Sequence, residues 1–275
     1  MKNFLVLSAL FISAHAFAWG PTGHRAVGEL AQRNLSTKAE LEILRILKGN
    51  TLAKVSTWPD EIKSEPEKYK HTFVWHYTEW PEDAKEHHES HDGGKLMTAI
   101  AERLKVLKDP AASPEDKEFS LKFLVHIIGD LHMPLHVGNG LDNGGNHCKV
   151  TFHGKLTNLH AVWDEAMIDF NKLSFTEMTS FVAQGRGPNA RAETMKGTPL
   201  DWALESKVIR PTIYPDNVKA PKEPVSTRVY CNKEVAEDDI PKLGYEYSYK
   251  FMPVVEKRIY EAGLRLAMLL NQTFQ

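Results

Sequence analysis

HIIGDLHMPLH, residues 126–136, places two potential metal ligands on one face of an expected helix and then ends that helix. His126 and Asp130 are four residues apart, so their Cβ atoms lie about 5–6 Å from each other on a helix surface. Pro134 cannot continue a regular helix, because its ring removes a donor and clashes with the preceding turn. We therefore expect His136 to turn back toward the same point.

A second pair with the same spacing follows in NLHAVWDEAM, residues 158–167, where His160 precedes Asp164 by four positions. Asn158 is a suitable N-cap for this helix. Either pair alone is also compatible with a surface ion pair, which is common and weak. Apolar residues around both pairs favour burial, where an unpaired charge is costly and a metal ion compensates for it. Two chelating pairs indicate more than one ion.

Other histidines fit metal ligation less well. His132 falls on another face of its helix than His126, and we expect it in the core or supporting a ligand from behind. His87, His88 and His91 lie in a polar, acidic stretch, and we expect them to be solvated rather than to form an auxiliary metal site.

The composition is that of a globular protein, with 275 residues, 42% hydrophobic residues and a formal net charge of −2. This near balance excludes the strongly basic surface of a duplex DNA-binding protein. Residues 1–18 have one Lys, an apolar run and a small-x-small site before Trp19, which predicts a secretory signal peptide. We expect the mature chain to be one domain, residues 19–275, located outside the cytoplasm in a periplasm or beyond.

Helical periodicity predicts a mainly α fold. The expected helices span residues 23–33, 38–47, 95–107, 114–131, 159–170, 202–208 and 243–270. One short β-hairpin is expected, with strands at 150–152 and 156–158 around a glycine turn. Residues 185–199 and the proline-rich run 211–224 are expected to be loops.

Cysteine usage is sparse, with Cys148 and Cys231 alone. In an exported protein such a pair is expected to form a disulfide, although the spacing does not prove it. Two distant cysteines cannot build a cysteine-rich zinc site, so nitrogen and oxygen must hold any metal here.

Seven motifs in order make the sequence resemble the secreted zinc-dependent single-strand-specific nucleases of fungi and plants. This chain would be a bacterial member of that family. Bacterial zinc phospholipase C is a more distant relative. They are WGPTGH (19–24), STWPD (56–60), WHY (75–77), HIIGDLHMPLH (126–136), DNGGN (142–146), NLHAVWD (158–164) and DWALES (201–206). Each is weak alone, but together they span the expected mature chain.

The resemblance implies three zinc ions. The first would be held by Asp60, His76, His126 and Asp130, and the second by His136, His160 and Asp164. The third would be held by His24, by Asp130 as a bridge, and by the amine and carbonyl of an N-terminal Trp19. Such nitrogen and carboxylate ligands, with positions left open for water, are typical of catalytic zinc.

The implied reaction is hydrolysis of single-stranded RNA and DNA by a zinc-bound hydroxide, since zinc lowers the pKa of bound water to about 7. We expect 5′-phosphate products and 3′-nucleotidase activity. Besides Asp60 and Asp130, we expect Lys63 to take part by binding phosphate; a solvated helix lysine is the alternative.

Substrate contacts are implied at four further positions. Tyr77 would stack on a base and Glu79 would bind an exocyclic amine, while Asn143 and Asn146 would bring polar donors near the substrate. Tyr77 is equally compatible with a core aromatic, and the DNGGN glycines with a plain turn.

Two other functions stay open. A zinc phospholipase C is disfavoured because the second pair ends in Asp164, where the phospholipase pattern has Glu. A non-catalytic zinc-binding protein of the cell envelope explains the histidines at 87–91, but not an Asp130 placed to bridge two ions. We expect no membrane anchor and no protein partner.

Overall fold

Helix α7 (Pro114–His132) lies at the centre of the computed structural model, which describes residues 19–215, 229–232 and 234–275. Ser113 caps its first turn by accepting a hydrogen bond from the amide of Asp116, and Met133 ends it directly before Pro134. Every residue from Ser120 to His132 is buried except Lys122, which is partly exposed. A helix that is buried on all sides must be enclosed by other elements.

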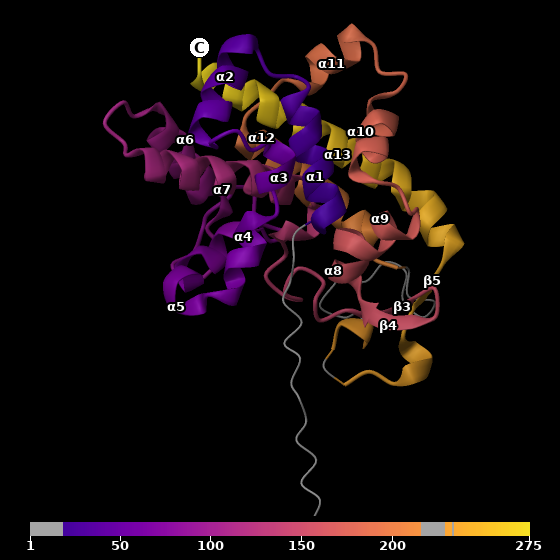
Figure 1. The fold of residues 1–275 in the computed structure, drawn as a ribbon. Helices are drawn as coiled ribbons and strands as arrows, with labels where there is room; N and C mark the ends of the chain where they lie inside the picture. Colours follow the sequence, from indigo (N-terminus) through magenta and orange to yellow (C-terminus); the bar gives the residue numbers. More distant parts are fainter. Residues whose placement is uncertain (1–18, 216–228, 233) are drawn as a thin grey trace, which may run out of the picture.

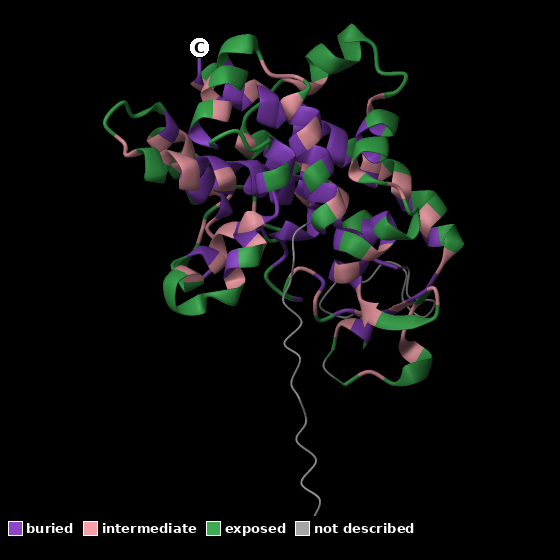
Figure 2. Cartoon of the chain, in the orientation of Figure 1, coloured by how far each residue is buried: buried purple, intermediate pink, exposed green. Residues whose placement is uncertain are grey.

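Those enclosing elements are α1 (Pro21–Gln32), α6 (Leu96–Lys108), α12 (Pro199–Ile213) and α13 (Tyr245–Thr273), all of which contact α7 (Figure 1). Buried apolar side chains from all of them join one hydrophobic cluster. Figure 2 shows this buried interior along α1, α7 and α13, with exposed residues at the outer ends of the helices. The mainly α fold is therefore confirmed.

Shorter elements complete the fold. The α-helices are α2 (Thr37–Ile46), α3 (Leu52–Val55), α4 (Trp58–Glu61), α5 (Pro66–Tyr69), α8 (Leu159–Ala161), α9 (Met167–Phe170), α10 (Phe175–Ala183) and α11 (Pro188–Thr194). The 3-10 turns are Ile62–Ser64, Lys70–His76, Pro134–His136, Val229–Cys231 and Glu237–Asp239. None of the helices in the described ranges is long and apolar enough to cross a bilayer.

The expected hairpin is present as β3 (Lys149–Phe152) and β4 (Lys155–Asn158), paired antiparallel. His153 and Gly154 both have positive φ at its turn, as a tight hairpin of this kind requires. Two parallel pairings were not predicted, because two-residue strands carry no periodicity. They join β3 to β5 (Lys242–Leu243), and β1 (Thr78–Glu79) to β2 (Val137–Gly138).

Three expectations about helices were wrong. Residues 185–199 contain α11, which begins with Pro188 in the first turn, where proline fits a helix. Helix α12 extends the expected 202–208 in both directions: a capping box of Thr198 and Asp201 starts it, and Pro211 lies inside its last turn. The helix expected at 159–170 is interrupted by a π-helical turn (Val162–Ala166).

Two sequence expectations fall on residues outside the described ranges. The proposed signal peptide, residues 1–18, is one, and most of the proline-rich run, residues 216–228, is the other.

Candidate metal centre

Eight buried or nearly buried His and Asp side chains gather beside the C-terminal half of α7. They form three groups, of which the first two share His126: His24, His126 and Asp130; Asp60, His76 and His126; and His136, His160 and Asp164. Within each group the candidate ligand atoms all lie within 4.8 Å of one another. The structure thus brings together every side chain that the sequence analysis assigned to metal binding.

Each ligand reaches the centre for a local reason. His126 and Asp130 share one face of α7, as their spacing predicts. The helix ends at Met133, and the 3-10 turn Pro134–His136 carries His136 back toward the centre. His160 and Asp164 remain 3.1 Å apart (Nε2 to Oδ2) although Asp164 lies in the π-helical turn.

Asp130 lies between two of the groups. Its Oδ1 is 3.3 Å from His24 Nε2, while its Oδ2 is 3.1 Å from His76 Nδ1 and 3.4 Å from His126 Nε2. The rings of His24 and His126 stack with centroids 3.8 Å apart. The two carboxylate oxygens of Asp130 therefore face different histidines, which is the arrangement that a bridging ligand needs.

Backbone carbonyls orient three of the histidines. The Nδ1 atoms of His126, His136 and His160 donate to the carbonyls of Ser56, His76 and Gly144 at 2.7, 2.5 and 2.7 Å. A carbonyl only accepts, so each Nδ1 carries the proton and each Nε2 keeps its lone pair. This support of the distal nitrogen is what metal-ligating histidines commonly have.

Several buried polar atoms of the centre lack a hydrogen-bond partner among the described residues. They include both ring nitrogens of His24, Oδ1 of Asp130 and Nε2 of His136. Leaving buried polar atoms unmatched costs about 1–3 kcal/mol each. A divalent cation bound by these nitrogen and oxygen atoms would remove that cost, so the donor set fits a metal such as zinc.

Protonation of the metal-free centre follows from burial. Burial, helped by neighbouring histidines and Lys63, lowers the pKa of His24 and His76 well below the ordinary value, and burial lowers that of His126 to about 4. The three imidazoles are thus neutral, the form that binds metal. Burial and the nearby Asp60 raise the pKa of Asp130, and a bound cation would oppose that rise.

Trp19 is fully buried against this centre. The amide of Gly20 donates to the carbonyl of Asp164 at 2.7 Å, which ties the start of the described chain to a candidate ligand. Gly129 leaves room for His24, since a Cβ there would lie 3.0 Å from His24 Nδ1.

A pocket of about 430 Å³ opens beside the centre, and we call it the base pocket. His76, His136 and His160 line it, together with Lys63. The four residues predicted to contact substrate also line it: Tyr77, Glu79, Asn143 and Asn146. Tyr77 is half-buried and lines the pocket, so it is not a core aromatic. Lys63 donates to Asp60 Oδ1 at 2.6 Å, so it is not a solvated lysine.

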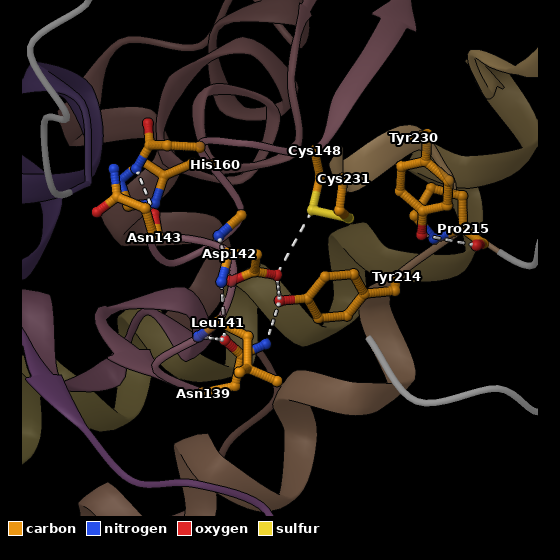
Figure 3. The surroundings of a disulfide bond; sticks show 12 residues. Asn139, Leu141, Asp142, Asn143, Cys148, His160, Tyr214, Pro215, Tyr230 and Cys231 are labelled. Carbon is orange, nitrogen blue, oxygen red and sulfur yellow. Dashed lines mark hydrogen bonds between the residues drawn. A yellow bond between two sulfur atoms is a disulfide. The ribbon is translucent and has the colours of Figure 1, made fainter. Parts of the chain in front are cut away.

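The DNGGN loop is braced from behind (Figure 3). Asp142 is buried and accepts hydrogen bonds from the amide of Gly145 at 3.0 Å and from the hydroxyl of Tyr214 at 2.6 Å. Beside it, the predicted disulfide between Cys148 and Cys231 is present. Sequence analysis missed Tyr214, because a single tyrosine at a helix end gives no signal. The loop is thus a supported wall of the base pocket as well as a turn.

Two buried arginines hold the turn that carries His136, and sequence analysis missed both. Arg258 Nε donates to the carbonyl of His132 at 3.0 Å, and Arg210 donates to the carbonyls of Val137 and Trp80. The contact of Arg258 satisfies a carbonyl that the end of α7 leaves without a helical partner, and the contacts of Arg210 join β2 to the segment after β1.

The remaining histidines behave mostly as expected. His132 is buried in the core, where Nδ1 bonds to the carbonyl of Ile128 and Nε2 lies 3.1 Å from Arg265. His88 and His91 are exposed. The expectation for His87 was wrong, since it is half-buried: its Nε2 is 2.7 Å from Thr78 Oγ1 and its ring packs on Trp80. Its loop folds back over β1.

Comparison with known proteins agrees with the geometry. The S1/P1 Nuclease family matches residues 19–275. Nuclease S1 of Aspergillus oryzae (strain ATCC 42149 / RIB 40) is 30% identical over 98% of this chain and 98% of its own length. Nuclease P1 of Penicillium citrinum is 33% identical over 92% of this chain and 97% of its own. Endonuclease 4 of Arabidopsis thaliana is 30% identical over 98% of this chain and 93% of its own. The chain therefore belongs to the S1/P1 nuclease family.

Proposed function

We propose that this chain is an exported zinc-dependent endonuclease that hydrolyses single-stranded RNA and DNA to 5′-phosphate products and also acts as a 3′-nucleotidase. The observation that carries the proposal is the set of three ligand groups beside a pocket that opens to solvent, with Asp130 placed between His24 of one group and His76 of another. Family membership supports the nuclease activity.

Three zinc ions would occupy the centre, with ligands as follows: Asp60, His76, His126 and Asp130; His136, His160 and Asp164; and His24, Asp130 and the amine and carbonyl of Trp19. When bound, the ions supply a nucleophile at neutral pH and balance charge on the phosphate.

The side chains of the pocket would orient the substrate. The ammonium group of Lys63, held by Asp60, can contact a phosphate oxygen at the rim of the centre. Tyr77 would stack on the base of the nucleotide whose 3′ oxygen leaves, and Glu79 would accept from an exocyclic amine. Asn143 also lines the pocket, in a turn of positive φ, and Asn146 Nδ2 braces that turn by donating to the carbonyl of Asn143.

Single strands suit this arrangement better than duplexes. The chain has 34 basic against 36 acidic residues, so it offers no surplus of positive charge for a long duplex track. Binding concentrated on one phosphate and one stacked base favours a flexible strand that can bend into the pocket.

A paired assay tests the proposal. Purified protein should contain about three zinc ions per chain and should cleave single-stranded DNA and release phosphate from 3′-nucleotides, both reversibly lost with a chelator. Phosphatidylcholine vesicles are the comparison substrate: cleavage of the lipid alone would identify a phospholipase C, and bound zinc without turnover on any substrate would identify a zinc-binding protein. One ion per chain would contradict the trinuclear centre.

Processing before Trp19 would complete the third site. We propose that residues 1–18 are a signal peptide and that residues 19–275 form the mature domain. A peptide nitrogen has no lone pair to give, whereas a free α-amine, with a pKa near 7.7–8.0, is readily deprotonated by a cation. Protein starting at Trp19 should bind three zinc ions, and protein with one extra Gly before Trp19 should bind two. Full zinc content and activity in the extended protein would contradict the amine as a ligand.

A further inference from the structure

A second pocket adjoins the metal centre, separated from the base pocket by Lys63, the only residue that lines both. Its volume is about 400 Å³, and we call it the Arg25 pocket. It is lined by Pro21, Arg25, Thr57, Asp60, Glu61, Lys63 and Ser64. Asp60, a candidate ligand, thus faces a pocket that the proposed function has not used.

Arg25 is the cation that this pocket offers for binding. It directly follows the candidate ligand His24 on α1, is exposed, and makes no hydrogen bond or ion pair with the described residues. Other exposed arginines of the N-terminal region are engaged: Arg33 pairs with Glu29 at 2.8 Å and Arg45 with Glu42 at 2.5 Å. The fork of guanidinium donors on Arg25 is therefore open, and it matches the oxygens of a phosphate.

The other polar groups of the pocket are already occupied. Thr57 Oγ1 donates to Glu61 Oε1 at 2.7 Å, and Ser64 Oγ donates to the carbonyl of Glu61 at 2.7 Å. Lys63 is held by Asp60 between the two pockets. An anionic ligand that enters beside Lys63 would therefore find its next positive charge at Arg25.

We infer that the Arg25 pocket receives the nucleotide on the 3′ side of the cut phosphate and that Arg25 binds the following phosphate. The inference rests on the proposed function and extends it. A strand would run from the base pocket, over Lys63, into the Arg25 pocket, so that both neighbours of the cut bond have a place. A 3′-nucleotide has only the nucleoside of the base pocket and would not reach Arg25.

The test compares a single-stranded thymidylate pentanucleotide with thymidine 3′-phosphate as substrates of the zinc-loaded protein. Arg25→Ala should raise KM for the pentanucleotide about five- to tenfold, with kcat changed less than twofold, and Arg25→Lys should recover part of the loss. Both constants for thymidine 3′-phosphate should stay within twofold. The slope of log(1/KM) for the pentanucleotide against log salt should become shallower by about 0.7, the contribution of one phosphate contact on a single strand.

Arg191→Ala is the matched control, because Arg191 is likewise exposed and lies on α11, away from the centre (Figure 1). It should leave all constants unchanged. Equal effects of Arg25→Ala on both substrates, or none on the pentanucleotide, would overturn the inference while the proposed function stands. A wild-type protein that cleaves neither substrate would instead overturn the proposed function, and the inference with it. If the wild-type protein cleaves the pentanucleotide but not thymidine 3′-phosphate, the salt dependence of KM decides. A slope that Arg25→Ala leaves unchanged contradicts the inference, and a shallower slope in Arg25→Ala supports it.

Discussion

Two clusters of buried ionisable groups contact the C-terminal part of α7, and they differ in whether their polar atoms find partners. One is the metal centre. The other, which we call the arginine cluster, consists of His132, Glu205, Arg258, Glu261 and Arg265. Both contain histidine and carboxylate groups in a setting where unpaired charge is costly.

Within the arginine cluster, each carboxylate has an arginine as its hydrogen-bond partner. Arg258 Nη1 donates to Glu205 at 2.6 Å and to Glu261 at 2.7 Å, while Arg265 donates to both carboxylate oxygens of Glu205. Burial acts to raise the pKa of Glu205, but its hydrogen bonds to the two arginines outweigh burial and lower it.

Within the metal centre, several buried polar atoms have no such partner among the described residues. Its one lysine bonds to Asp60, and atoms of His24, Asp130 and His136 are left without hydrogen-bond partners in the described chain. The comparison teaches that burial of charge alone does not indicate a site. A site is indicated instead by buried ligand atoms that converge and have no hydrogen-bond partner, because a bound ion or molecule must then compensate for them.

The largest effect is expected from Asp130→Asn. The amide keeps the shape of the carboxylate and removes the charge that faces His24 of one ligand group and His76 of another, so bound zinc should fall by more than one ion. Single-strand cleavage should fall by far more than 100-fold, since even residues behind metal ligands cost about 10–100-fold. Metal analysis and initial rates measure both effects. Lys63→Ala should lower turnover less, and equal losses would mean that Asp130 does not bridge.

The arginine cluster should respond in stability instead. Arg258→Met removes from the buried Glu261 its nearest cation and leaves the partly exposed Glu205 with Arg265 alone, which costs about 3 kcal/mol of unfolding free energy. Urea unfolding measures the loss, and zinc content should be unchanged under conditions where the variant is folded. Lys257→Met is the control: Lys257 is 60% exposed and 3.6 Å from Glu261, so its loss should cost less than about 1 kcal/mol. Similar losses in the two variants would contradict the role of Arg258.

The two clusters also differ in how far sequence could predict them. Residues four apart on one helix share a face, so His126 with Asp130 and His160 with Asp164 could be paired from spacing. The remaining ligands came from the family resemblance, because no local pattern joins His24 or Asp60 to the centre. Arg258 bonds to a carbonyl 126 residues earlier in the chain, and nothing in its surroundings distinguishes it from a surface arginine.

Helix positions were predictable where an apolar period or a cap defines them, as for α7. The π-helical turn and α11 were not. The π-helical turn has the same apolar pattern as an α-helix, and α11 has no buried residues, so no apolar face predicts it.

The smallest expected effect is on the pH dependence of the metal-free protein. Burial lowers the pKa of His126 to about 4, against about 6.5 in an unfolded chain. Between these values the unfolded state binds the proton and the folded state does not, so stability falls as pH drops from 6.5 to 4. His24 and His76 act in the same direction, as does His132 in the arginine cluster. The raised pKa of Asp130 opposes them.

Because His132 contributes within the same pH window, a variant must isolate the metal centre. Urea midpoints of chelator-treated protein, measured from pH 7.5 to 4.5, should fall more steeply for the wild type than for His126→Gln, which has no imidazole to protonate at this position. His88→Gln removes an 81% exposed histidine and should leave the slope unchanged. If His126→Gln and the wild type lose stability in parallel, the imidazole of His126 is not held neutral by burial, and the metal-free centre is more open to water than this structure describes.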